Sequence, residues 1–349
     1  MRGKRNSIIK ILLILGSIVC AVLFVLFIKN EEKLTTERQR HVNELAEELQ
    51  PVNEERRKWQ DDDKAWKETL DKKTKGESCM LIAVDNMGKN LYDTVFTMMA
   101  QYGFKATFTL KDGQLPESPD VEEQSRVYIN TEQFQEMLDA GWEYGISVSE
   151  PEITENGESD WLVRLDKAIE SLNQGQVGVP GVVFASSSQY SADDDAELIS
   201  RGFKEISVLD KDKASVITNT EEDFIHISSS FLNQNNMDIE QTMDKAASNR
   251  QSMAVTLNEV LRVSKDGDAD VSLTKFTSFF NKLKGMEEQG LFQIMTYSEY
   301  YDYQKQLEQN KIKLLADYKE FKQEMKQKLA ELDQQEQEIV KKTIPEGFH

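Results

Sequence analysis

Residues 80–110 carry the pattern that most restricts the fold of this chain. Residues 80–84 form a short, continuous apolar run, which is typical of a strand covered on both faces. A polar turn that begins at Asp85 follows, then a predicted helix with one apolar face that ends at Gly103, then a second apolar run at 106–110. This strand–helix–strand unit predicts a parallel α/β sheet, with polar side chains at the carboxyl end of its first strand, where such sheets hold their functional groups.

The alternation of strands and helices continues along the chain. Further strands are predicted at residues 142–149, 182–185, 203–209, 224–227, 253–257 and 291–295, with helices between them. One helix is predicted to begin at Ser191, because Ser191 and Asp194 have the spacing of a capping box. Seven or eight strands separated by helices predict a barrel-like α/β domain over residues 77–303 rather than a sandwich.

The order of these motifs resembles the polysaccharide deacetylase (NodB-homology, carbohydrate esterase family 4) domain. V-D-N at 84–86 and A-T-F-T at 106–109 stand where that family has T-F-D-D-G and A-T-F-F. G-W-E-Y-G-I-S at 141–147 is similar to the family's G-H-E-I-G-S-H. The resemblance covers residues 78–303, weakens after residue 149, and implies the distorted (β/α)7 barrel of the polysaccharide deacetylase type.

The resemblance also implies a site, which this sequence changes. The family holds zinc or another divalent metal with one Asp and two His, beside a second Asp that acts as general base. Asp85 matches the base, but Asn86 stands at the metal-binding Asp, and Ser147 and Pro151 stand at the two His positions. A neutral amide is a weak ligand and proline cannot ligate through its side chain. We therefore expect no metal or other cofactor, and the role of Asp85 stays open.

The resemblance further places Asn86, Glu143, Ser147 and Asn258 along the family's active-site groove, where we expect them to contribute to binding. The histidine inventory fits the loss of a metal site, because the whole chain has only three histidines and none has a partner at i+4. The alternative is a rebuilt calcium- or magnesium-like site made only of carboxylates, with acidic residues such as Glu143 as ligands.

The amino terminus predicts a membrane anchor. Four basic residues precede the uncharged run 11–28, which is close to the length needed to cross a bilayer. The position of these basic residues predicts that residues 1–10 are cytoplasmic and that the chain after the anchor is exported. The alternative to an anchor is a signal peptide that is cleaved off. The exported part retains 38 basic and 62 acidic residues, a net charge of 38 − 62 = −24. That charge argues against nucleic acid and anionic polymers as partners, but not against a neutral glycan.

Helical segments flank the predicted barrel. Residues 29–76 predict a stalk of two helical segments broken at Pro51. Residues 297–342 predict one long helix with a heptad seam, the basis of a coiled-coil region at 304–343 before a tail at 344–349. The partner of the seam is either the stalk of the same chain or the same helix of a second chain, which would make a homo-oligomer.

The sequence thus predicts a single-pass membrane protein of the cell surface with a polysaccharide deacetylase-like barrel. The leading hypothesis is a pseudoenzyme that binds or assembles cell-wall or extracellular polysaccharide. The alternatives are a divergent metal-dependent carbohydrate deacetylase, and a coiled-coil scaffold or regulator.

Overall fold

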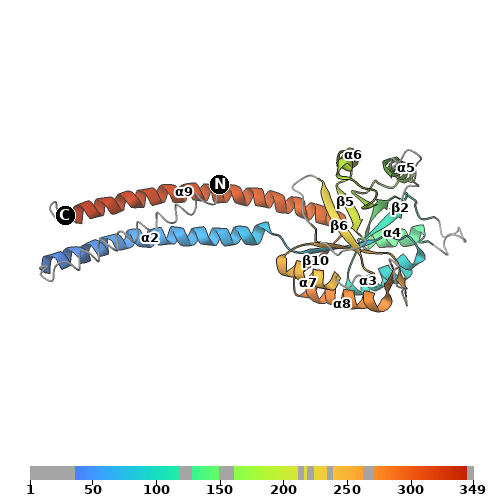
Figure 1. Cartoon of the computed structure of the whole chain (residues 1–349), viewed down its shortest axis with the longest axis horizontal. Helices are drawn as coiled ribbons and strands as arrows, with labels where there is room; N and C mark the ends of the chain where they lie inside the picture. The colour runs from blue at the N-terminus through green and yellow to red at the C-terminus, as the bar shows by residue number, and fades with distance from the viewer. Residues whose placement is uncertain are drawn as a thin grey trace. The chain divides into compact units, whose positions relative to one another are not determined.

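The computed structural model describes residues 36–117, 128–148, 161–210, 216–217, 224–233, 239–261 and 270–343. The chain divides into two compact units. One unit holds the residues up to 70 and from 313 onward, and the other holds residues 71–312. The described part of the first unit is a pair of helices, and the second unit is built on a parallel β-sheet (Figure 1).

Eight parallel strands form the main sheet of the second unit. They are β1 (Cys79–Val84), β2 (Thr107–Lys111), β3 (Glu143–Ser147), β4 (Val182–Ser186), β5 (Glu205–Asp210), β6 (Ile225–Phe231), β7 (Met253–Leu257) and β10 (Gln293–Met295). Strands β1 to β7 lie side by side in chain order, and β1 also pairs with β7 over residues 80–84. Seven strands therefore close into a barrel, which confirms the predicted α/β barrel.

The barrel is distorted at β1. One edge of β1 pairs with β7, while its other edge pairs with β10 over residues 79–81 and with β2 only at residues 83–84. Because a strand has two hydrogen-bonding edges, β10 lies between the amino-terminal halves of β1 and β2. This end of the barrel is thus bounded by the segment that leads into the last helix.

Helices cover the outside of the barrel. They are α3 (Thr97–Tyr102), α4 (Thr131–Asp139), α5 (Trp161–Gln174), α6 (Asp195–Ser200), α7 (Ile239–Asn249) and α8 (Leu273–Glu288), with a π-helical turn η1 (Leu91–Phe96) before α3 and a 3-10 turn η2 (Ala192–Asp194) before α6. The predicted helix after β1 thus begins as a π-helix, and it ends at Gly103 with a φ of 72°, as expected. A short pair, β8 (Val260–Leu261) with β9 (Val271–Ser272), was not predicted.

Two apolar clusters divide the core between the outer and inner faces of the barrel. The outer cluster joins strand residues such as Val84 and Phe108 to helix residues such as Phe280. The inner cluster joins β1, β4, β6 and β7 to Tyr297 and Tyr300, which are both 0% exposed. Because these strands lie around the barrel, their shared cluster fills the barrel interior. Tyr297 and Tyr300, from the first turns of the last helix, close the amino-terminal end of the barrel.

The first unit pairs two long helices of the same chain. Helix α2 (Thr36–Thr74) and helix α9 (Tyr297–Thr343) run antiparallel: Glu48 contacts Lys342, and Arg56 contacts Glu336 at 2.7 Å. The rings of Trp59 and Trp66 pack at a tilt against Phe321, and Leu332 is 0% exposed. The heptad seam of α9 therefore packs on the amino-terminal stalk of the same chain, which is one of the two partners left open by the sequence. Pairing with the same helix of a second chain stays a prediction.

Pro51 does not divide the stalk, so the prediction of two helical segments was wrong. Helix α2 runs without a break from Thr36 to Thr74 with Pro51 inside it. A proline removes one helical hydrogen bond and crowds the preceding turn. Here contacts to α9 on both sides of Pro51, through Glu48 and Arg56, and the burial of Val52 favour the continuous helix.

No helix within the described ranges, from 36 to 343 with their gaps, is long and apolar enough to cross a membrane. The predicted transmembrane segment at 11–28 and the tail at 344–349 lie outside the described residues.

Candidate functional site

Asp85 lies at the carboxyl end of the barrel, directly after β1. Its backbone N–H donates to Leu257 O at 2.7 Å, which fixes Asp85 where β1 meets β7. Its Oδ1 accepts from Thr109 Oγ1 on β2 at 2.8 Å. Asp85 follows Val84 of the outer cluster, and strand side chains alternate, so Asp85 belongs to the inner face with Ala83. The carboxylate therefore stands at the mouth of the barrel, half-buried and held from two strands.

The amide of Asn86 is engaged on both of its atoms. Its Oδ1 accepts from Gly88 N at 2.5 Å, a local turn of the kind that Asn forms readily. Its Nδ2 donates to Glu259 Oε1 at 3.1 Å, beyond the end of β7. Asn86 thus ties the turn after β1 to the segment after β7.

Asn258 and Ser147 complete the mouth at two other strand ends. Asn258 follows β7, and its Nδ2 donates to Asp270 Oδ1 at 2.8 Å. Ser147 is the last residue of β3, between Lys111 of β2 and Phe184 of β4 in register. Ser147 is 9% exposed, and among the described residues its Oγ has no hydrogen-bond partner. A buried hydroxyl without a partner is unfavourable, so this group can gain from a bound ligand.

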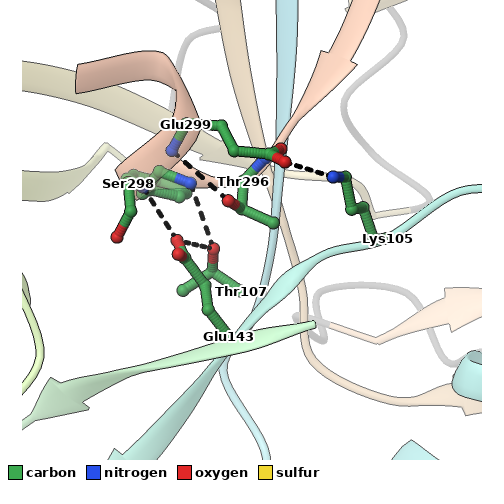
Figure 2. A network of polar contacts seen from close by, with 7 residues as sticks. Lys105, Thr107, Glu143, Thr296, Ser298 and Glu299 are labelled. Atoms are coloured by element: carbon green, nitrogen blue, oxygen red, sulfur yellow. Dashed lines mark hydrogen bonds and ion pairs between the residues drawn. The ribbon is translucent and has the colours of Figure 1, made fainter. Parts of the chain in front are cut away.

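Glu143 lies at the opposite end of the barrel from these residues, and its placement in the groove was wrong. It is the first residue of β3, whereas Ser147 is the last. Figure 2 shows its carboxylate directed at Thr107 and the start of α9: Oε1 accepts from Thr107 Oγ1 at 2.7 Å and from Ser298 N at 3.0 Å. The predicted segment 141–147 spans a whole strand, so its two ends face opposite mouths.

A second carboxyl group, which the sequence analysis missed, lies inside the same end of the barrel. Glu205 begins β5 and is 1% exposed, and its Oε1 is without a hydrogen-bond partner among the described residues. Burial, then the nearby charge of Glu143, raises the pKa of Glu205 well above its usual value. Tyr297, whose hydroxyl lies 3.0 Å from Ser207 Oγ, plugs this end. The alternation of Glu205 and Ser207 with apolar residues was a signal for a polar inner face.

A cavity of about 300 Å3 lies beside the mouth, next to the turn after β1. Met87, Gln114, Glu117 and Tyr128 contribute to its lining. Tyr128 is 49% exposed. An exposed aromatic side chain with amide and carboxylate groups around it can bind a polar ligand that also has apolar faces.

The mouth does not fit the metal that the family resemblance implies. A catalytic zinc site has three protein ligands with defined geometry. Of the positions concerned, Asp85 offers a carboxylate, Asn86 an amide whose oxygen is already used, and Ser147 a hydroxyl. Within the described part of the chain no group of three His, Cys, Asp or Glu side chains is arranged to hold a metal ion. Pro151 lies outside that part.

Fold and mouth together define a distorted parallel α/β barrel: seven strands closed by the β1–β7 pair, with Asp85 directly after the first strand. No family model and no curated protein matches the sequence. Among solved structures, the peptidoglycan deacetylase PdaC from Bacillus subtilis is 15% identical, with a TM-score of 0.40 over 68% of this chain and 96% of that one.

Two other solved structures are similar at the same level. A CE4 family pseudoenzyme from Bacillus anthracis is 12% identical, with a TM-score of 0.39 over 65% of this chain and 66% of that one. The CE4 domain of a multidomain xylanase from the hindgut metagenome of Trinervitermes trinervoides is 13% identical, with a TM-score of 0.38 over 66% and 92%. Identities and scores this low transfer no activity, metal or ligand to this chain.

Proposed function

We propose that this chain is a cell-surface protein whose barrel binds cell-wall or extracellular polysaccharide without hydrolysing it. The proposal rests on the side chains at the mouth of the barrel and on their hydrogen bonds. Asp85 and Ser147 present polar groups there, while the amide of Asn86, at the position of a metal ligand, is engaged by Gly88 and Glu259. Because the side chains at the family's metal positions do not suit such a metal, we assign Asp85 the role of a hydrogen-bond acceptor rather than a general base.

The chemistry of the mouth and of the neighbouring cavity suits a neutral sugar. A carboxylate accepts hydrogen bonds from sugar hydroxyls, a serine hydroxyl can donate or accept, and an exposed ring such as Tyr128 packs on the apolar face of a pyranose. The cavity volume of about 300 Å3 is at the lower limit for small-molecule sites, which corresponds to one sugar unit of a longer chain. The acidic composition disfavours an anionic polymer.

The proposal assigns the flanking segments to placement of the barrel. Residues 11–28 anchor the chain in the membrane, with the amino terminus in the cytoplasm and the barrel outside. The seam of α9 packs on α2 of the same chain, through residues such as Phe321 and Leu332. We therefore assign the helical pair to spacing between membrane and barrel rather than to dimerisation.

Binding of neutral oligosaccharides to the full chain in detergent micelles tests the proposal. Calorimetry with N-acetylglucosamine oligomers of four to six units should show binding that is unchanged by a chelator. Asp85→Asn removes a charged acceptor but keeps a similar shape, so binding should weaken by about ten-fold or more. Asp93→Asn makes the same change on η1, where Asp93 is exposed, and should bind like the wild type.

Two outcomes would contradict the proposal. Absence of binding to every neutral oligosaccharide tested would remove the glycan function. Release of acetate that stops with the chelator and in Asp85→Asn would instead support the divergent deacetylase.

A further inference from the structure

Three titratable side chains meet on the outer side of the barrel, away from Asp85. Tyr190 lies after β4, Asp195 begins α6, and His226 is the second residue of β6. The hydroxyl of Tyr190 lies 2.6 Å from Asp195 Oδ1 and 2.9 Å from His226 Nδ1. His226 Nε2 lies 2.9 Å from Asp195 Oδ2. The three groups therefore form a closed ring of contacts, called here the Tyr–Asp–His ring.

The number of protons in the ring decides how many of these contacts are hydrogen bonds. A phenol carries one O–H, a neutral imidazole one N–H, and a carboxylate none. With Asp195 ionised and His226 neutral, the ring holds two donors for three contacts. Only a third proton, on the imidazole or on the carboxyl group, completes the ring: for example, both ring N–H groups of His226 donate and the Tyr190 O–H donates to Asp195.

Acidic and aromatic side chains lie beside the ring. From η2, Asp194 adds a negative charge near Tyr190, while α6 contributes Asp195. Ahead of β6, Phe224 places an aromatic ring at 5.4 Å from His226 without a charge. Burial, then the hydrogen bond with Asp195, raises the pKa of Tyr190, so its hydroxyl keeps its proton across the physiological range.

The ring fixes a segment that reaches the mouth of the barrel. Tyr190 follows Gln189, a buried residue whose Nε2 donates to Val148 O at 3.1 Å and whose Oε1 accepts from Ser186 N at 2.9 Å. Val148 comes directly after Ser147, the buried hydroxyl at the mouth. Within residues 186–195, Gln189 is thus held by Val148, just after β3, while Tyr190 and Asp195 are held by His226 of β6.

We propose that the Tyr–Asp–His ring is a proton-operated latch: with its third proton all three contacts are hydrogen bonds and the segment 186–195 is held firmly on β6, and loss of that proton removes one of the three hydrogen bonds. The segment is then held less tightly on β6, next to Gln189, whose side chain donates to Val148 just after β3. The state of the latch therefore changes the mobility of the β3–β4 side of the mouth. This regulation does not depend on which ligand the mouth binds.

Amide hydrogen exchange of the full chain in detergent micelles tests the latch. Peptides that cover residues 186–195 are compared at pH 5.5 and pH 7.5, after correction for the intrinsic dependence of exchange on pH. In the wild type, protection should be about five-fold greater at pH 5.5, the effect of one additional ordinary hydrogen bond on an opening equilibrium. Tyr190→Phe keeps the aromatic side chain but removes its hydroxyl. Protection of residues 186–195 in this variant should be low and equal at both pH values.

Tyr102→Phe is the matched control. Its hydroxyl donates to Asn281 Oδ1 at 3.0 Å between α3 and α8, so its loss should leave the pH dependence of residues 186–195 unchanged. Equal wild-type protection at the two pH values would overturn the latch, whether or not the variants fold. A pH dependence of the same size in Tyr190→Phe would also overturn it, because the hydroxyl of Tyr190 would then take no part in the effect.

Discussion

Glu205 makes the stability of the barrel depend on pH in a direction that the structure fixes. The side chain is 1% exposed, Oε1 has no partner among the described residues, and Glu143 lies nearby on β3. Burial, followed by the charge of Glu143, raises the pKa of Glu205 well above its usual value, with Lys204 opposing. The folded barrel therefore favours the neutral acid.

The sign of the effect follows from proton linkage. A carboxyl group whose pKa is raised on folding holds its proton more tightly in the folded state. Its contribution to the stability of the folded state is fully present below the pKa that the group has in the unfolded chain. That contribution is lost as the pH rises toward the pKa of the group in the folded barrel. Between these two values, Glu205 should cost the folded state about 1.4 kcal/mol for each pH unit.

Glu205→Gln tests this slope, because glutamine has nearly the same shape and does not ionise. Urea unfolding of the full chain, followed by near-ultraviolet circular dichroism at pH 5 to 8, gives the free energy of unfolding. The advantage of Glu205→Gln over the wild type should grow with pH by up to about 1.4 kcal/mol per unit. Glu288→Gln, the same change on the surface of α8, should follow the wild type. Parallel curves for wild type and Glu205→Gln would refute the reasoning.

Two further substitutions test the packing. Gly145→Ala should destabilise the barrel by about 1–3 kcal/mol in urea, because a Cβ there would lie 2.4 Å from a ring carbon of Phe184; Gly285→Ala, where a Cβ meets nothing within 4 Å, should not destabilise. Leu332→Ala should cost the helical pair about 2–5 kcal/mol, measured by thermal loss of helical circular dichroism, because Leu332 is 0% exposed. Ile312→Ala, at 62% exposure, should cost less than about 0.5 kcal/mol, and equal losses for the two would contradict the seam.

The strands could be predicted because their signal is local. Residues 80–84 are apolar throughout, and β1 is buried on both faces, between the outer helices and the filled interior. The same held for β7, whose predicted and observed bounds are identical. Pro51 shows the limit of a local rule, since contacts of α2 with α9 decide the course of the helix.

The candidate site was only partly predictable, because the end of a strand at which a residue lies depends on strand boundaries. Asp85 follows β1, as the apolar run 80–84 predicted, whereas Ser147 ends β3 inside the predicted strand 142–149, and Glu143 was assigned to the same mouth although it begins β3. Glu205 points inward because the sheet closes into a barrel. The Tyr–Asp–His ring depends on contacts between segments that are distant in the sequence. No sequence spacing specifies those contacts.

The central claim is that the mouth around Asp85 binds glycan but neither holds a divalent metal nor hydrolyses its ligand. The most direct measurement combines metal content with acetate release from N-acetylglucosamine oligomers, using the full chain supplied with Zn²⁺, Co²⁺, Ca²⁺ or Mg²⁺. The account predicts no stoichiometric ion at micromolar concentration and no acetate above the level of Asp85→Ala. One bound ion per chain, with acetate release that Asp85→Ala abolishes, would contradict it.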